Sequence, residues 1–138
     1  MTAVREVMTS NPRHIDTSET VAHAARLMAS EGVGALPIQG EDKQLKGMIT
    51  DRDIVVKVLA EGKDPVAVHV GELAQGDPVT VTPDDDVEQA LSAMARHQVR
   101  RVPVVQGSEL VGIIAQADAA RAVPEDKTGK IVDSISRD

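Results

Sequence analysis

One short stretch of the sequence brings a hydroxyl and two carboxylates together directly after a run of small apolar residues. It reads Gly47-Met48-Ile49-Thr50-Asp51-Arg52-Asp53, and a related phrase, Gly112-Ile113-Ile114-Ala115-Gln116-Ala117-Asp118, follows 65 positions later (112 − 47). Each copy is typical of a strand that runs into the start of a helix. Polar side chains at such a junction lie beside the unpaired N–H groups of the first helical turn, where hydroxyls and anions can bind. The pattern therefore favours the binding of a ligand at these two junctions.

The two phrases belong to an internal repeat that covers nearly the whole chain. Pro12 and Pro78 stand 66 positions apart (78 − 12), and the same offset relates many other positions of the two halves. We predict one repeat at residues 5–62, a second at 71–124, and a C-terminal tail at 125–138. The paired positions include Val21 with Val87, Ala24 with Ala90, Met28 with Met94, Val33 with Val99 and Pro37 with Pro103.

The first repeat predicts a helix, two strands and a second helix. Residues 16–19 offer N-caps for the first helix, and Gly32 is a stop signal. Strands are expected at 35–38 and 45–49, and the second helix is expected from Asp51 to Ala60. Helical spacing places four apolar residues on one face of the first helix: Val21, Ala24, Ala25 and Met28.

The second repeat predicts the same order. Three acids at 84–86 suit the positive end of a helix, strands are expected at 102–105 and 110–114, and a last helix begins at Asp118 and stops at Pro124. The expected apolar face of its first helix is Val87, Ala90, Leu91 and Met94. Because each repeat alone buries little surface, we predict a mixed α/β (α+β) fold in which the repeats pack through their sheets about a pseudo-twofold axis.

The composition of the 138-residue chain excludes several classes of function. Its net charge of −7, and the lack of Phe, Tyr and Trp, argue against nucleic-acid binding. The absence of Cys excludes disulfides and thiolate metal sites. With neither a signal-peptide pattern nor a membrane-length apolar run, a soluble cytoplasmic protein is expected.

Further motifs accompany the two junction phrases: Val7-Met8-Thr9 with Asn11-Pro12, Gly34-Ala35-Leu36-Pro37-Ile38, and Arg100-Arg101-Val102-Pro103-Val104-Val105. In this order, and twice over, these motifs resemble the cystathionine-β-synthase (CBS) domain family. The run from Gly34 to Lys57 is also similar to small stand-alone CBS pair proteins of actinobacteria, including a hypoxia-response type.

The resemblance implies two βαββα units and an adenosine-containing ligand, such as AMP, ADP, ATP or S-adenosylmethionine, bound in clefts between the repeats. It implies that Thr50 and Asp53 contact ribose hydroxyls, with Asp118 in the equivalent role. It also implies that Arg100 and Arg101 contact phosphates. The base would then lie against aliphatic side chains: Ile15, Leu36, Ile49, Val81, Val102 and Ile114.

Each assignment has a structural alternative. Thr50 and Asp53 also fit a capping box, although the usual residue at the second position is Glu or Gln. Asp118 stays where position 115 is alanine, which favours ligand binding over capping. The arginine pair can be solvated, and the aliphatic set can be plain core. The four dispersed histidines have no metal-ligand spacing, and no nucleophile–base pair is present, so we expect neither a metal site nor an enzyme.

Two hypotheses for function follow. In the first, the protein is a non-enzymatic regulatory module that senses an adenosine-containing ligand. In the second, it is a structural or protein-interaction CBS pair without a nucleotide, acting through its dimer surface on an unknown protein partner. A homodimer is expected because apolar residues recur on the helices that follow the junctions: Ile54, Val55, Val58, Ala119 and Ala122.

Overall fold

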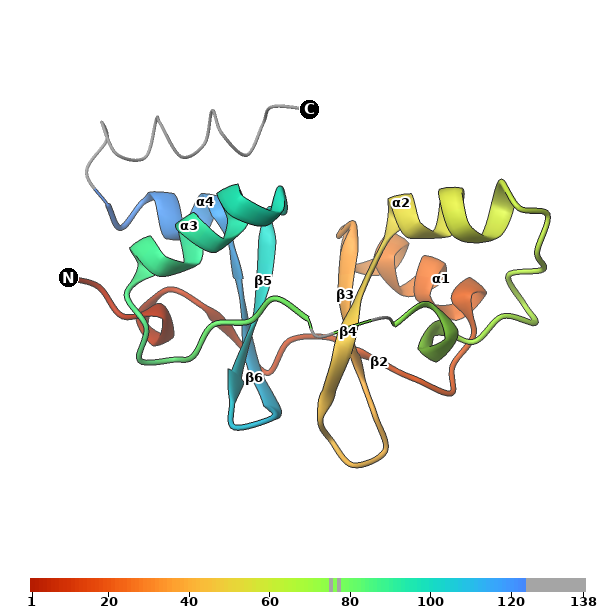
Figure 1. Cartoon of the computed structure of the whole chain (residues 1–138), viewed down its shortest axis with the longest axis horizontal. Helices are drawn as coiled ribbons and strands as arrows, with labels where there is room; N and C mark the ends of the chain where they lie inside the picture. The colour runs from red at the N-terminus through yellow and green to blue at the C-terminus, as the bar shows by residue number, and fades with distance from the viewer. Residues whose placement is uncertain (75, 77, 124–138) are drawn as a thin grey trace. The chain divides into compact units, whose positions relative to one another are not determined.

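The computed structural model describes residues 1–74, 76 and 78–123 (Figure 1). The chain forms two compact units, and each carries one three-stranded sheet. Unit 2 is Arg13–Pro78, and unit 1 combines Met1–Pro12 with the chain from Val79 onward. The mixed α/β fold class predicted from the sequence is confirmed. The tail at 125–138 and the stop at Pro124 lie outside the described residues.

Unit 2 is built on a sheet with the strand order β2-β3-β4. Strand β2 runs parallel to β3, and β3 pairs antiparallel with β4, with Leu36 opposite Ile49. The predicted strands are confirmed. The elements of this unit are β2 (Ile15–Asp16), α1 (Val21–Glu31), β3 (Ala35–Gln39), β4 (Leu45–Thr50), α2 (Asp51–Asp53), η2 (Ile54–Leu59) and η3 (Val70–Leu73).

Unit 1 has a sheet with the order β1-β6-β5, in which both pairings are antiparallel. Val102 lies opposite Ile114, as Leu36 lies opposite Ile49 in unit 2, so the two central hairpins match. The elements are η1 (Val4–Glu6), β1 (Thr9–Ser10), α3 (Val87–His97), β5 (Arg101–Gln106), β6 (Glu109–Ala115) and α4 (Gln116–Ala120).

The helix boundaries differ from the prediction at three places. Thr20, and none of residues 16–19, caps α1 by accepting the His23 N–H at 3.1 Å, because Asp16 is already paired in β2. Helix α4 begins at Gln116 instead of Asp118, since the Gln116 N–H bonds to the Arg100 carbonyl as soon as β6 ends. The predicted helix from Asp51 to Ala60 is one α-helical turn followed by the π-helix η2. Four of the six η2 residues are β-branched, a side-chain type that lowers α-helix propensity.

Each unit has its own aliphatic core. In unit 2 it includes Val21, Ala24 and Met28 from α1, whereas Ala25, predicted on the same face, is exposed at its edge. In unit 1 the predicted face of α3 is fully buried, which confirms it: Val87, Ala90, Leu91 and Met94.

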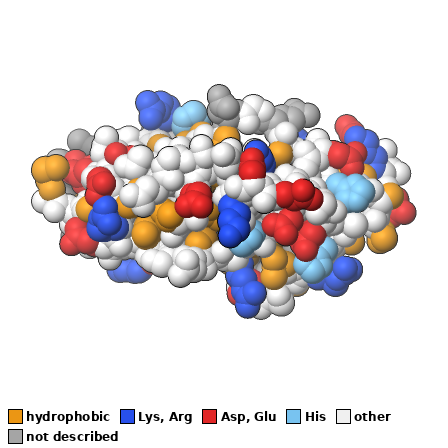
Figure 2. Space-filling view, turned by 90° about the horizontal axis from the view of Figure 1, so that it is seen from below, with side chains coloured by type: hydrophobic (Ala, Val, Ile, Leu, Met, Phe, Trp, Pro, Cys, Tyr) orange, Lys and Arg blue, Asp and Glu red, His pale blue; other side chains and the backbone are white. Residues whose placement is uncertain are grey.

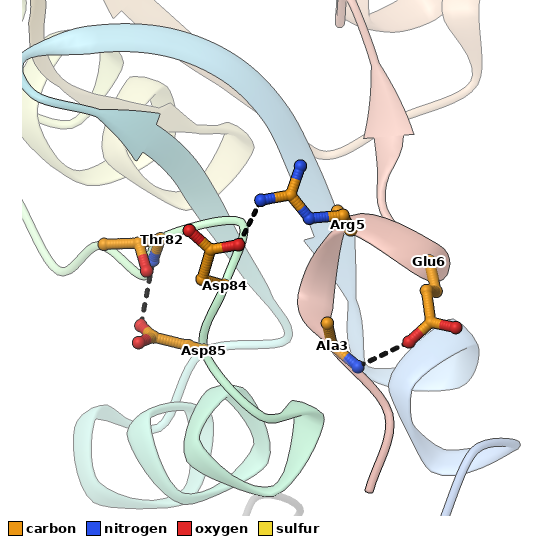
Figure 3. Close-up of polar contacts among 6 residues, drawn as sticks. All are labelled: Ala3, Arg5, Glu6, Thr82, Asp84 and Asp85. Carbon is orange, nitrogen blue, oxygen red and sulfur yellow. Dashed lines mark hydrogen bonds and ion pairs between the residues drawn. The ribbon is translucent and has the colours of Figure 1, made fainter.

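The N-terminal segment of the chain completes the core of unit 1. Val4 is fully buried, and its N–H bonds to the Asp85 carbonyl at 2.8 Å. Beside it, Arg5 forms an ion pair with Asp84 (Figure 3). Strand β1 then lies so close to β6 that a Cβ added at Gly112 would stand 3.0 Å from the Thr9 carbonyl oxygen.

Unit 2 has an equivalent turn, supplied by the segment between the repeats. Val70 in η3 is fully buried, and its N–H bonds to the Glu19 carbonyl at 2.9 Å. Val4 and Val70 are 66 positions apart (70 − 4), which is the repeat offset. The turn at the start of the first repeat therefore packs in unit 1, with the second repeat. The turn at the start of the second repeat packs in unit 2, with the first, so repeats and units have different boundaries.

Across the described residues, none of the helices is both long and apolar enough to cross a bilayer.

Candidate functional site

The first junction, where β4 meets α2, is held by reciprocal hydrogen bonds. The Thr50 hydroxyl oxygen accepts the Asp53 N–H at 3.0 Å, and Asp53 Oδ2 accepts the Thr50 N–H at 2.9 Å. The capping box that the sequence suggested is therefore present, with Asp53 in the place of the usual Glu or Gln. The Asp51 N–H also bonds to the Gly34 carbonyl at 2.9 Å, which fixes the junction against the start of β3.

The capping role leaves acceptor capacity on the Asp53 carboxylate. Its Oδ1 lies 3.3 Å from Lys57 Nζ, so one described contact goes to each oxygen. A carboxylate offers about four lone-pair sites, which leaves about one on each oxygen. The side chain is 26% exposed. Capping and binding of a vicinal diol are thus compatible, although the sequence had presented them as alternatives.

The second junction, where β6 meets α4, is built differently. Ala115 occupies the N-cap position and has no side-chain hydrogen bond. The Asp118 carboxylate forms its described contact with Arg121, on the next helical turn, and is 33% exposed. Asp118 is therefore a more open acid than Asp53.

Arg100 and Arg101 lie at this second junction. The Arg100 carbonyl accepts the Gln116 N–H at 2.8 Å, and Arg101 is the register partner of Ala115. The start of β5 and the start of α4 are thus joined through the backbone, near Asp118. Arg100 is exposed and Arg101 is half-buried. In unit 2, Gly34 makes the matching backbone contact without a charged side chain.

The aliphatic candidates for contact with a base are core residues of the two units. Ile15 and Leu36 are each 1% exposed within unit 2, and Ile49 is fully buried beside them. In unit 1, the equivalent residues are Val81 (5% exposed), Val102 (0%) and Ile114 (0%). Each of them packs in the core of its own unit. Their contact with a ligand stays a prediction.

The sequence prediction missed an open groove of about 470 Å³ on unit 2. It runs between α1 and the α2–η2 segment, and the Asp51 carboxylate is its charged group. The small residues at 25 and 29, one helical turn apart, were the available signal. Among its lining residues are Ala25, Ala29, Val33, Ile54, Val55 and Asp51.

Three of the residues from which a dimer surface was predicted do not lie at the surface. Ile54 (7% exposed), Val58 (0%) and Ala119 (0%) are buried inside their own units, because the helices that carry them pack on the sheets. Val55 remains 56% exposed. The exposed apolar residues beside it on η2 are Val56 (46%) and Leu59 (53%).

Histidine and acidic side chains gather on one face of unit 2, as Figure 2 shows. They form separate pairs: His14–Asp16 at 3.9 Å, His23–Glu19 at 3.4 Å and His69–Glu72 at 3.5 Å. No group of three or more metal-ligating side chains occurs among residues 1–74, 76 and 78–123.

One carboxyl outside the junctions has a perturbed pKa. In the turn between β3 and β4, the hydrogen bond from Lys46 holds the pKa of Asp42 below its ordinary value, and the backbone N–H of Gln44 acts in the same direction. This turn lies at the far end of the hairpin from Thr50. The Asp42 shift therefore has no bearing on the junctions.

The fold and the duplicated strand–helix junction define a tandem-repeat α/β protein. The chain belongs to the CBS domain family, because the family model for the CBS domain matches residues 4–60 and 70–125. The resemblance inferred from the sequence is confirmed.

Known proteins of this family match most of the chain. Hypoxic response protein 1 of Mycobacterium tuberculosis is 43% identical over 135 residues, which cover 98% of this chain and 94% of that protein. A crystal structure of Hypoxic Response Protein I with two coordinated zinc ions has a TM-score of 0.83 and 44% identity, and covers 89% of this chain and 100% of that one.

Two solved neighbours hold adenosine compounds. CBSX2 in complex with AMP has a TM-score of 0.76 and 26% identity, and the match covers 92% of this chain and 99% of that one. The CBS domain pair of MJ0100, in complex with 5′-methylthioadenosine and S-adenosyl-L-methionine, has a TM-score of 0.77 and 27% identity, with 88% and 95% covered.

Proposed function

We propose that this CBS pair is a cytoplasmic, non-enzymatic regulatory module that binds an adenosine-containing ligand. The observation that carries the proposal is the Asp53 carboxylate, which is fixed by a cap and an ion pair and still has acceptor capacity on both oxygens. The AMP and S-adenosyl complexes of CBSX2 and MJ0100 support this ligand class. The candidate ligands are AMP, ADP, ATP and S-adenosylmethionine.

Each candidate residue has a distinct role in this proposal. Asp53 accepts hydrogen bonds from the two ribose hydroxyls, with Thr50 beside it, and Asp118 does the same at the second junction. Arg100 and Arg101 contact phosphates through their planar guanidinium groups. The core residues whose edges would meet the base are Ile15, Leu36, Val81 and Val102.

Isothermal titration calorimetry against AMP, ADP, ATP and S-adenosylmethionine tests the proposal directly. We expect micromolar binding of at least one of them. We also expect Asp53→Asn to weaken that binding more than Asp118→Asn does, because the second junction has already lost the hydroxyl at position 115. Absence of heat with all four ligands would contradict the proposal.

A second candidate function rests on the groove and the exposed apolar residues of η2. With Val55, Val56 and Leu59 about half exposed, the chain can act as a homodimeric interaction module without a nucleotide, whose surface also meets a protein partner.

Sedimentation at tens of micromolar tests the dimer. We expect Val55→Glu to give a monomer of 14.6 kDa. The matched control is Val66→Glu, since Val66 is 67% exposed but lies outside η2. A monomeric wild type would remove this second function.

A further inference from the structure

The Asp53 carboxylate is held at two points by two different parts of the chain. Its Oδ2 accepts the Thr50 N–H at 2.9 Å from the end of β4. Its Oδ1 lies 3.3 Å from Lys57 Nζ, which comes from the π-helix one turn further on. The backbone bond belongs to the capping box, whereas the lysine contact has no part in it.

The second contact changes what the carboxylate can do. The torsion that sets the plane of an aspartate carboxylate is broad and roughly two-fold. A hydrogen bond to one oxygen leaves the other free to move, whereas contacts to both oxygens fix the plane. The remaining lone pairs then point in set directions, which lowers the cost of ordering the group when a diol binds.

The other junction lacks this arrangement. Asp118 has a cationic neighbour in Arg121, as Asp53 has in Lys57. However, the described contacts include no bond from the Ala115 N–H to the Asp118 carboxylate, so Asp118 lacks the backbone contact that Asp53 receives from Thr50. At the junction of unit 2, one carboxylate therefore receives both a backbone N–H bond and a cationic side chain. At the junction of unit 1, the carboxylate does not receive both.

We propose that Lys57 is a positioning residue of the ribose site in unit 2. It fixes the plane of the Asp53 carboxylate so that both oxygens face the two hydroxyls of a bound adenosine compound. This inference rests on the proposed function, because it concerns the same site. Lys57 touches the carboxylate and not the ligand, so it affects ligands with and without phosphate alike.

The test compares three variants by calorimetry with two probes, AMP and adenosine. Lys57→Met removes the charge and keeps most of the side-chain length, and Lys57→Arg restores a cation. Lys63→Met is the matched control, since Lys63 is 53% exposed and pairs with Glu61 at 3.2 Å, while Lys57 is 50% exposed. The control removes the same charge from the same unit.

We expect Lys57→Met to weaken AMP and adenosine by the same factor, about two- to fivefold, the range that a partly exposed ion pair supports. Lys57→Arg should stay close to wild type, and Lys63→Met should bind as wild type. The loss should shrink at about 1 M salt, because screening weakens the exposed pair in the wild type as well.

Three results would overturn the inference. Unchanged binding in Lys57→Met would mean that the backbone bond alone orients Asp53. Weakening of AMP but not adenosine would make Lys57 a phosphate ligand, and tighter binding would make it a competitor of the ribose. If wild type binds neither probe nor any other adenosine compound, the proposed function is wrong, and the positioning role of Lys57 is wrong with it.

Discussion

The two strand–helix junctions share a backbone design and differ in their side chains. In both, the first N–H of the helix bonds to a carbonyl at the start of the neighbouring strand, from Asp51 to Gly34 and from Gln116 to Arg100. At the first junction Asp53 is part of the capping box, and at the second the described contact of the matching acid, Asp118, is with Arg121. The backbone design of the junction is thus the same in both units, whereas the side chains differ, so we expect the two junctions to bind a ligand unequally.

The largest expected effect concerns the two buried valines that close the units. Val4→Ala and Val70→Ala each remove a fully buried side chain, so each should lower the free energy of unfolding by about 1.5–3 kcal/mol. Hydrogen exchange should show the loss of protection in residues 79–123 for Val4→Ala and in residues 13–78 for Val70→Ala. Loss in residues 13–62 for Val4→Ala would mean that the sequence repeats, and not the compact units, are the units of stability.

A smaller effect is expected from exchanging the cap residues. Thr50→Ala should cost about 1 kcal/mol, because the Asp53 N–H loses its acceptor. Ala115→Thr should stabilise the chain by about 0.5 kcal/mol, if the new hydroxyl accepts the Asp118 N–H as Thr50 does at its own junction. Chemical denaturation followed by circular dichroism measures both. A destabilised Ala115→Thr would show that the second junction cannot accommodate the first junction's design.

Periodicity and repetition made most of the fold predictable. The aliphatic faces of the long helices and all four central strands follow from spacing, because alternation and helical periods reflect burial directly. The packing of η1 and η3, each in the unit formed mainly by the other repeat, could not be predicted. Nothing in the spacing of Val4 or Val70 indicates which sheet each of them packs against. The same holds for Ala25, which shares a helical face with buried neighbours but lies at its exposed edge.

For the candidate site, the sequence indicated which residues stand at the junctions but did not predict all of their contacts. The motif alone left capping and ribose binding as alternatives for Asp53. Only the separate partners of its two oxygens indicate that one carboxylate can do both. The available signal for Lys57 was its spacing of four positions from Asp53 on the predicted helix, which is the spacing of an acid–lysine pair.

The central claim is that Asp53 both caps a helix and holds ribose, and paired thermal melts of wild type, Asp53→Asn and Asp53→Ala with and without AMP test it most directly. Asn keeps an oxygen that accepts the Thr50 N–H, so Asp53→Asn without ligand should lose only about 0.3–1 kcal/mol of stability. It should also lose most of the ligand-induced stabilisation, which is about 2.7 kcal/mol at a hundredfold excess over the dissociation constant.

Asp53→Ala should lose both the cap, at about 0.5–2 kcal/mol, and the ligand effect, with Asp118→Ala as the milder comparison for the second junction. A full AMP-induced rise in Asp53→Asn and Asp53→Ala, from melting points lowered in both conditions, would mean that the carboxylate is a cap alone and would contradict the account.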